Sequence, residues 1–143
     1  MPKISKNNFE LFYEIWKKSA KRKSLWIPSE KEFQSLIKAF GDNIFCLTIN
    51  SMAGAVVLTH RQTAFYYYAG STAEGVVLNL PYLIVWEAML AAKKRGCKVW
   101  DFEGIYDSRW PNKGWQGFSH FKKSFGGQEI EFPGSFEKWR WPF

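Results

Sequence analysis

Three charged side chains in the C-terminal part of this 143-residue sequence could form a site for a ligand or a reaction. Asp101 and Glu103 come at the end of a predicted buried strand at residues 97–102. They lie two residues apart, so in a strand their carboxylates would face the same side. Lys122 belongs to a short predicted helix at residues 117–125. Facing those carboxylates, its ammonium would stay charged and fixed in position.

Helical periodicity separates Lys122 from its neighbour Lys123. At ~100° per residue, Phe118, Phe121 and Phe125 form one buried stripe. Lys122 then lies about 40° from Phe118, whereas Lys123 lies about 140° away and points to water. Only Lys122 can run its aliphatic stem along the core and present its ammonium to a cleft. A plain salt bridge at the helix surface is the alternative.

Two amphipathic helices are predicted near the N-terminus. The first follows a cap at Asn7 or Asn8 and ends in a basic run at residues 17–23. Ser29 and Glu32 form a capping box at the start of the second helix. The basic run can compensate the helix dipole or bind phosphate, and the sequence leaves both open.

The pattern then changes to strand periodicity. Residues 43–50, 53–60 and 63–69 predict an antiparallel meander. A long helix begins near Pro81, and because it is apolar nearly all round it is expected to be covered on most sides. The strand at residues 97–102 follows. This order predicts an α/β fold, a mixed sheet with helices on both faces. The order of elements resembles that of the N-acetyltransferase (GNAT) fold.

Consecutive aromatic residues mark the third run of the meander. Strand alternation expects Phe65 and Tyr67 to face one side and Tyr66 and Tyr68 the other. A buried tyrosine needs a partner for its hydroxyl, so a row of three that ends near Ser71 indicates a strand leading into a polar cleft. Ordinary sheet packing is the alternative for any single tyrosine.

Composition narrows the possible partners. Lys and Arg total 20 against 13 acidic residues, and the net charge of +7 favours nucleic acid, phosphate or an anionic membrane face. Cys46 and Cys97 lie in apparent strands without a metal-binding spacing, so we expect reduced core thiols and no metal site. No segment approaches a membrane-spanning length. We expect a cytoplasmic protein, which could also work at the inner face of the membrane.

Other enzyme classes lack their motifs here. His60 and His120 are the two histidines, and neither lies near a plausible nucleophile in the sequence. There is no Walker loop and no GxGxxG. The Q/R-x-x-G-x-G/A signature with which acetyl-CoA-dependent N-acetyltransferases bind phosphate is missing too, although the order of helices and strands looks like theirs.

Four short runs occur in a characteristic order. They are FYYYAGS at 65–71, WEA at 86–88, DFEG at 101–104 and FKKSFGG at 121–127. Together they resemble the second half of the FemABX-type peptidoglycan bridge-forming aminoacyltransferases, over about residues 9–132. Family members carry two N-acetyltransferase-like domains and transfer an amino acid from aminoacyl-tRNA to the stem-peptide amine of a peptidoglycan precursor. The resemblance implies that residues 1–143 form one such domain.

The resemblance also implies site residues. Phe121 and Lys122 look like the Phe-Lys pair near the reacting ester, with Lys122 offsetting charge on the oxyanion. The predicted substrate-binding residues are Arg22, Tyr67, Tyr68, Ser71, Asp101 and Glu103. Arg22 is similar in position to an Arg that meets precursor phosphates, and the residues from 67 to 71 fall where the family lines its substrate cleft.

The resemblance implies no cofactor, with aminoacyl-tRNA as donor and a UDP-linked or lipid-linked muropeptide as acceptor, in cell wall peptidoglycan biosynthesis. The basic run and the loop at residues 109–113 would bind RNA or phosphate. The sequence resembles only one of the family's two domains. A homodimer or a partner chain could supply the other, the sequence could be a piece of a longer protein, or the domain could have another use. Trp139 and Trp141 could form one face of a contact with a second chain, and sealing the chain's own core is the alternative for them. Two alternatives are an acyl-CoA-dependent N-acyltransferase and a non-catalytic remnant that binds tRNA or precursor.

Overall fold

The computed structural model describes residues 2–109, 112–134 and 138. The chain forms two compact units, Met1–Glu103 and Gly104–Phe143. The expectation of one N-acetyltransferase-like domain over the whole chain stays a prediction. Trp110, Trp139 and Trp141 lie outside the described residues.

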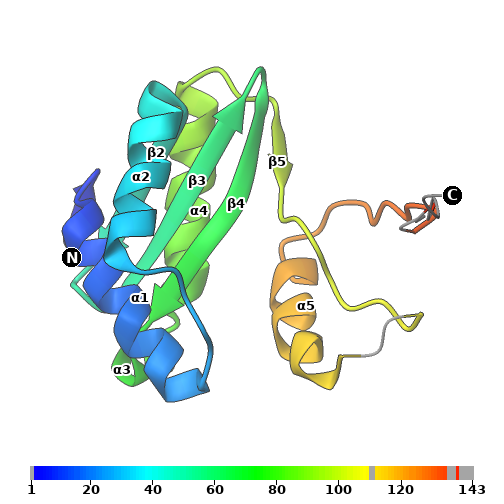
Figure 1. Cartoon of the computed structure of the whole chain (residues 1–143), viewed down its shortest axis with the longest axis horizontal. Coiled ribbons are helices and arrows are strands. Elements are labelled where there is room, and N and C mark those ends of the chain that lie inside the picture. Colours follow the sequence, from blue (N-terminus) through cyan, green and yellow to red (C-terminus); the bar gives the residue numbers. More distant parts are fainter. Residues whose placement is uncertain (1, 110–111, 135–137, 139–143) are drawn as a thin grey trace, which may run out of the picture. The chain divides into compact units, whose positions relative to one another are not determined.

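The first unit is built on a mixed sheet of five strands in the order β1-β2-β3-β4-β5 (Figure 1). The strands are β1 (Ile4–Lys6), β2 (Ile44–Ile49), β3 (Ala53–His60), β4 (Thr63–Ser71) and β5 (Val99–Asp101). Neighbours from β1 to β4 pair antiparallel, and β5 pairs parallel to β4. The predicted meander is confirmed, whereas the three-residue β1 was missed because it is too short to show an alternation.

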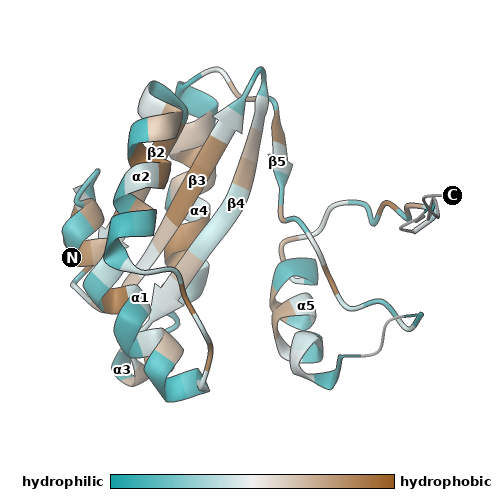
Figure 2. Cartoon of the chain, viewed as in Figure 1, coloured by the Kyte–Doolittle hydropathy of each residue, from teal (hydrophilic) through white to brown (hydrophobic). Residues whose placement is uncertain are grey.

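Helices cover both faces of this sheet, as predicted. α1 (Phe9–Lys23) and α2 (Glu30–Phe40) pack on one face through an aromatic cluster around Phe33. α4 (Leu80–Lys94) packs on the other through Ile84 and its neighbours. The brown colour of β3 in Figure 2 reflects its apolar residues, six of which are buried in a row. The short α3 (Ala73–Val77) connects β4 to α4 and was not predicted.

The helix starts follow from local hydrogen bonds. The Asn8 side chain accepts from the Leu11 backbone N–H at 3.0 Å, which caps α1. At α2 the Ser29 backbone N–H donates to the Glu32 carboxylate at 2.7 Å, and the Ser29 hydroxyl caps the Glu32 N–H in return. Both predicted caps are confirmed, because each depends on residues three apart in the chain.

Two predictions about burial are wrong. α4 was expected to be covered on most sides, yet Tyr82, Trp86 and Leu90 are 41%, 55% and 37% exposed. The apolar residues of α4 exceed what one face of a sheet can bury, so the remainder stay at the surface. β5 was expected to be a buried strand, but it is an edge of the described sheet and Val99 is 54% exposed.

The second unit contains η2 (Lys113–Trp115) and α5 (Gln116–Lys123). Polar contacts hold α5 to the segment that precedes it. The buried Ser119 hydroxyl accepts from the Tyr106 backbone N–H at 2.6 Å and donates to the Trp115 carbonyl at 2.7 Å. The predicted helix is therefore confirmed, with bounds shifted by one or two residues.

Candidate active site

The exposed edge of β4 is the most distinctive feature of the first unit. β5 pairs with β4 only from Thr63↔Val99 to Phe65↔Asp101. β4 continues to Ser71, and on that side no described strand pairs with its last residues. Backbone donors and acceptors along such an edge can hydrogen-bond an extended ligand that carries amides.

A β-bulge lies within this edge. Val57 pairs with Tyr66 and Val56 pairs with Tyr68, so Tyr67 is an extra residue without a partner on β3. The expected alternation is therefore confirmed as far as Tyr67, which shares a face with Phe65, and is wrong at Tyr68. Tyr67 and Tyr68 both pack toward the cluster of α1 and α2, whereas Tyr66 packs toward α4. Bulges re-aim side chains in this way and are frequent beside functional sites.

The two tyrosines of the bulge form a compact pair. Their ring centroids are 4.4 Å apart, and Tyr68 lies 4.2 Å from the ring of Trp16 on α1. Burial, together with the charge and hydrogen bonding of Tyr67, raises the pKa of Tyr68 to about 12, and the negative charges of Glu103 and Glu32 act in the same direction. At neutral pH the Tyr68 hydroxyl is thus a neutral group that can donate a hydrogen bond.

The structure revises the expected arrangement of the two carboxylates. The strand ends at Asp101, and Glu103 adopts a left-handed backbone with φ of +59°. The same-side prediction assumed a continuing strand and is wrong for that reason. Instead the Asp101 carboxylate accepts from the Glu103 backbone N–H at 2.6 Å. Asp101 thereby fixes the turn that carries Glu103 away from β5.

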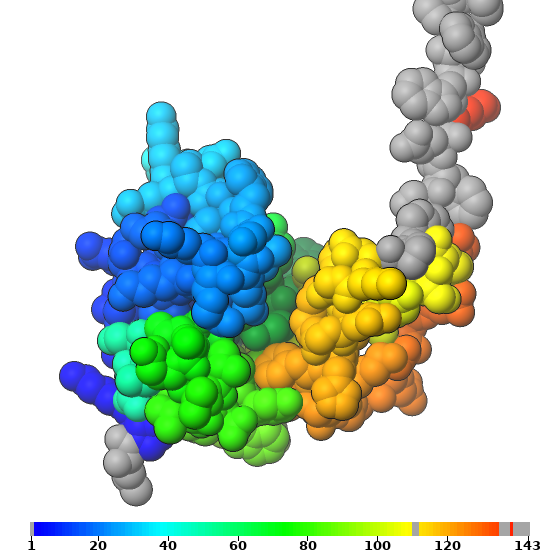
Figure 3. Space-filling view, turned by 90° about the horizontal axis from the view of Figure 1, so that it is seen from below, coloured from blue at the N-terminus to red at the C-terminus, as the bar shows by residue number. Residues whose placement is uncertain are grey.

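Arg22 and Ser71 come together at the far end of β4. The guanidinium of Arg22 donates to the Ser71 carbonyl at 3.3 Å, and Ser71 is buried. One residue earlier, an added Cβ at Gly70 would stand 2.8 Å from the backbone of Trp16, so α1 crosses β4 where only glycine fits. In Figure 3 the blue atoms of α1 and the green atoms around α3 lie side by side at this end.

Lys122 has a defined environment within the second unit. Its ammonium donates to the Gly104 carbonyl at 2.7 Å and lies 4.9 Å from the centroid of the Phe118 ring. Lys123 is exposed and pairs with Glu129 at 2.7 Å. The expected contrast between the two lysines in position is confirmed. Phe121 packs edge-on against Phe125 with ring centroids 5.3 Å apart, within the predicted stripe.

In the loop before α5, the cation Arg109 forms ion pairs within the protein. Arg109 forms a bidentate pair with Asp107, with its closest contact at 2.6 Å, and also lies 3.1 Å from Glu131. The hydrogen bonds from Arg109 lower the pKa of Asp107. This pairing weakens the expectation that the loop binds RNA through Arg109.

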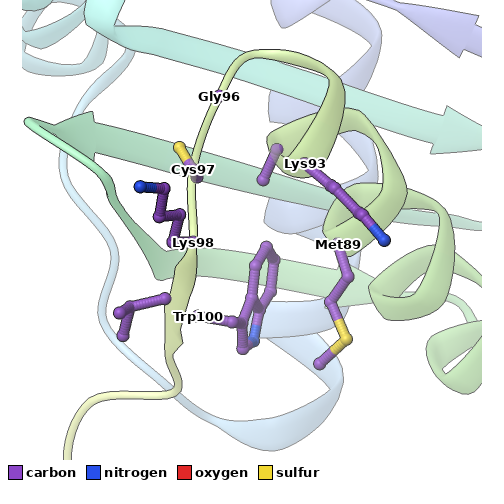
Figure 4. Close-up of a pocket in the computed structure, with 8 residues that line it drawn as sticks. Met89, Lys93, Gly96, Cys97, Lys98 and Trp100 are labelled. Atoms are coloured by element: carbon purple, nitrogen blue, oxygen red, sulfur yellow. The ribbon is translucent and has the colours of Figure 1, made fainter.

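A separate pocket of about 580 Å³ lies between α4 and β5 (Figure 4). It is lined by Met89, Ala92, Lys93, Gly96, Cys97, Lys98, Val99 and Trp100. The buried indole N–H of Trp100 has no hydrogen-bond partner among the described residues. None of the predicted site residues lines this pocket. They fall into two groups, one along β4 in the first unit and one on α5 in the second.

The structure brings together two subsets of the predicted residues. Tyr67, Tyr68 and Glu103 interact in the first unit, and Arg22 meets Ser71 at the end of the same strand. Lys122 and Phe121 belong to the second unit, so the predicted pairing of Lys122 with the two carboxylates stays a prediction. Sequence reasoning missed Trp16, whose ring packs against that of Tyr68.

The sequence matches the model of one known protein family. Residues 48–142 match the model of the FemAB family, a span that includes the bulge, the Glu103 turn and α5. The chain belongs to the FemAB family. The resemblance found in the four short runs is confirmed, and no curated protein matches the sequence significantly.

Solved structures show the fold of this FemAB family protein. An aminoglycoside acetyltransferase from an uncultured soil metagenomic sample, in complex with sisomicin, is 12% identical with a TM-score of 0.69 over 97% of each chain. The ribosomal-protein-S18-alanine N-acetyltransferase from Escherichia coli is 18% identical, with a TM-score of 0.65 over 92% of this chain and 80% of that chain. The predicted GNAT fold is confirmed.

A third similar structure is aminoglycoside 6'-N-acetyltransferase from Acinetobacter haemolyticus, which is 16% identical with a TM-score of 0.64 over 96% of this chain and 99% of that chain. Family membership and fold together support an acyltransferase activity. Among the described residues, no helix has the length and apolar character needed to cross a membrane.

Proposed function

We propose that this FemAB family protein transfers an amino acid from aminoacyl-tRNA to the stem-peptide amine of a peptidoglycan precursor. The observation that carries the proposal is the FemAB match over residues 48–142. In the reaction the amine attacks the carbonyl of the aminoacyl ester, an amide forms, and the tRNA hydroxyl leaves with a proton. Negative charge grows on the carbonyl oxygen before the ester bond breaks.

Lys122 is the group that we assign to this developing charge. Its ammonium is already oriented by the Gly104 carbonyl and the Phe118 ring. A cation that is fixed in advance stabilises a transition state more than a ground state, because it need not reorganise as charge develops. Phe121, on the same helix, would pack beside the reacting ester.

The edge of β4 is the surface that we assign to the acceptor. A stem peptide is an extended chain of amides, which suits an unpaired strand edge. Tyr68 would donate a hydrogen bond to it as a neutral phenol, and Tyr67 and Glu103 would line the same surface. Arg22, at the end of β4, would meet precursor phosphate.

An acyl-CoA-dependent N-acyltransferase is the second candidate. The fold favours it, because the similar structures are acetyltransferases. The missing Q/R-x-x-G-x-G/A signature disfavours it. A strand edge alone does not separate the two, since a stem peptide and the pantetheine arm of coenzyme A both carry amides.

One assay separates the candidates. The purified protein is incubated with UDP-linked or lipid-linked muropeptide, and with either a pool of aminoacyl-tRNA or acetyl-CoA. We expect the muropeptide to gain the mass of an amino acid residue only with the charged tRNA. A gain of an acetyl group instead would favour the second candidate. Binding of tRNA or muropeptide without transfer, in the presence of any candidate partner chain, would favour a non-catalytic role.

The same proposal includes association with a second chain. The exposed residues Tyr82, Trp86 and Leu90 recur every four positions along α4 and so form one apolar stripe. We assign this stripe to a homodimer or to a partner chain. Sedimentation at micromolar concentration, alone and with the products of neighbouring genes, is the check. A monomer in every mixture would contradict the assignment.

A further inference from the structure

Large apolar side chains are exposed where α1 ends and where α3 ends. Trp26 is 81% exposed, Val77 is 79%, Leu25 is 60% and Leu78 is 58%. Exposed apolar residues that gather at one place, rather than singly, mark a surface that a membrane or another molecule covers. The proposed active site accounts for none of these four side chains.

The two segments lie next to each other. The Arg22 guanidinium on α1 donates to the carbonyl of Ser71, which directly precedes the Thr72 cap of α3. The pKa of Glu74 is lowered by hydrogen bonds at its own backbone and Thr72, and also by the charge of Lys18 on α1. Figures 1 and 3 agree in placing the C-terminal part of α1 beside α3.

The same surface is strongly basic. Residues 17–26 and 72–78 contain five Lys or Arg and a single acidic residue, Glu74. We define the α1–α3 surface by Lys18, Lys21, Arg22, Leu25, Trp26, Val76, Val77 and Leu78. It therefore combines cations with exposed tryptophan and aliphatic side chains.

We propose that the α1–α3 surface binds an anionic membrane. Lysines and arginines are attracted to acidic headgroups, while tryptophan and aliphatic side chains insert at the boundary with the acyl chains. RNA would satisfy the cations and could stack on Trp26, but it offers no apolar phase to Val77 and Leu78. The aliphatic half of the surface therefore favours a bilayer over a nucleic acid.

This inference goes beyond the proposed transfer activity and does not depend on it. If both hold, Ser71 ends the open edge of β4 beside the α1–α3 surface, so the acceptor site would open close to the headgroups. That position suits the lipid-linked form of the precursor better than the UDP-linked form. Membrane binding can be measured without any substrate, so failure of one idea leaves the other testable.

The test is co-sedimentation with vesicles of phosphatidylcholine alone or with about one-third phosphatidylglycerol. The wild-type protein should bind only the anionic vesicles. Trp26→Ser with Val77→Ser, and separately Lys18→Gln with Lys21→Gln, should each weaken binding about tenfold or more. All four side chains are exposed or on a helix surface, and the melting temperature of each variant checks that the fold is intact.

The matched controls are the exposed Phe132 and the two lysines in the last turn of α4, to which no binding role is assigned. Phe132→Ser, and Lys93→Gln with Lys94→Gln, should leave vesicle binding unchanged. The proposal is overturned if the wild-type protein does not bind anionic vesicles, or if the control variants lose as much binding as the α1–α3 variants. Binding of tRNA but not of vesicles through Lys18 and Lys21 would assign the surface to RNA instead.

Discussion

The two compact units of this protein are stabilised in different ways. The first is organised by apolar burial on both faces of a sheet, with side chains such as Phe33 and Ile84 about 1% exposed. In the described part of the second, Ser119 is the buried residue of α5, and polar contacts of Ser119 and Lys122 join this helix to the segment at residues 104–106. Substitutions should therefore affect folding most in the first unit and transfer chemistry most in the second.

Removing the centre of the aromatic cluster should have the largest effect. Phe33 contacts Phe12, Tyr13 and Trp16 with ring centroids 5.6–5.8 Å away. Phe33→Ala should lower the free energy of unfolding by about 3–5 kcal/mol, because it leaves a cavity among rigid rings. Phe132→Ala in the second unit is the control, since that residue is 72% exposed and should change stability by less than about 0.5 kcal/mol. Urea denaturation measures both.

Lys122→Ala should lower the activity strongly and change the stability little. Loss of a fixed cation at the developing oxyanion should raise the barrier by about 3 kcal/mol and slow transfer at least about a hundredfold. The melting temperature should change little, because Lys122 is partly exposed and the Ser119 contacts with Tyr106 and Trp115 remain. Lys123→Ala removes only the exposed pair with Glu129 and should keep full activity. Equal rates for the two variants would refute the assignment of Lys122.

Replacing one glycine in each unit by alanine should change the stability in opposite directions. Gly70→Ala forces a methyl group to within 2.8 Å of the Trp16 backbone and should destabilise the first unit by about 1–3 kcal/mol. Gly117→Ala on α5 meets nothing within 4 Å and should stabilise its helix by about 0.5–1 kcal/mol. Thermal melts of both variants test this, and a stabilising Gly70→Ala would contradict the close crossing of α1 and β4.

The smallest expected effect concerns the capping box of α2. Hydrogen bonds from Ser29 lower the pKa of Glu32 from 4.5. Because the pKa of Glu32 is lower in the folded state than in the unfolded state, its charge stabilises the fold at pH values above the unfolded-state pKa. This stabilisation is lost as the pH falls through the folded-state pKa. The stability difference between the wild type and Glu32→Ala should therefore shrink below about pH 4.5. A difference that stays constant down to pH 2 would show that the carboxylate charge has no part in it.

The sequence predicted those features that depend on short-range spacing. The caps at Asn8 and Ser29, the meander, and the position of Lys122 at the edge of the Phe118 stripe each follow from residues a few positions apart. The burial of α4 and β5 was misjudged because it depends on which neighbours cover them, and one sequence does not specify that.

The candidate site was harder to predict than the scaffold. Its tyrosines depend on one extra residue in β4, and its carboxylates on a left-handed turn at Glu103. Both are departures from the regular period on which strand predictions rest. The glutamate at position 103 does not indicate a positive φ, because glycine and asparagine are the residues that usually adopt this backbone conformation.

The extra residue in β4 also affects how distant relatives should be compared. Because Tyr67 has no partner on β3, a relative with a regular strand must be aligned with a one-residue gap at that position. An alignment without the gap would shift every later residue of the strand by one. It would match Tyr68 to a side chain on the opposite face and place Gly70 away from the helix crossing. At identities of 12–18%, such a shift costs little in score, so superposed backbones are the safer guide to equivalent residues.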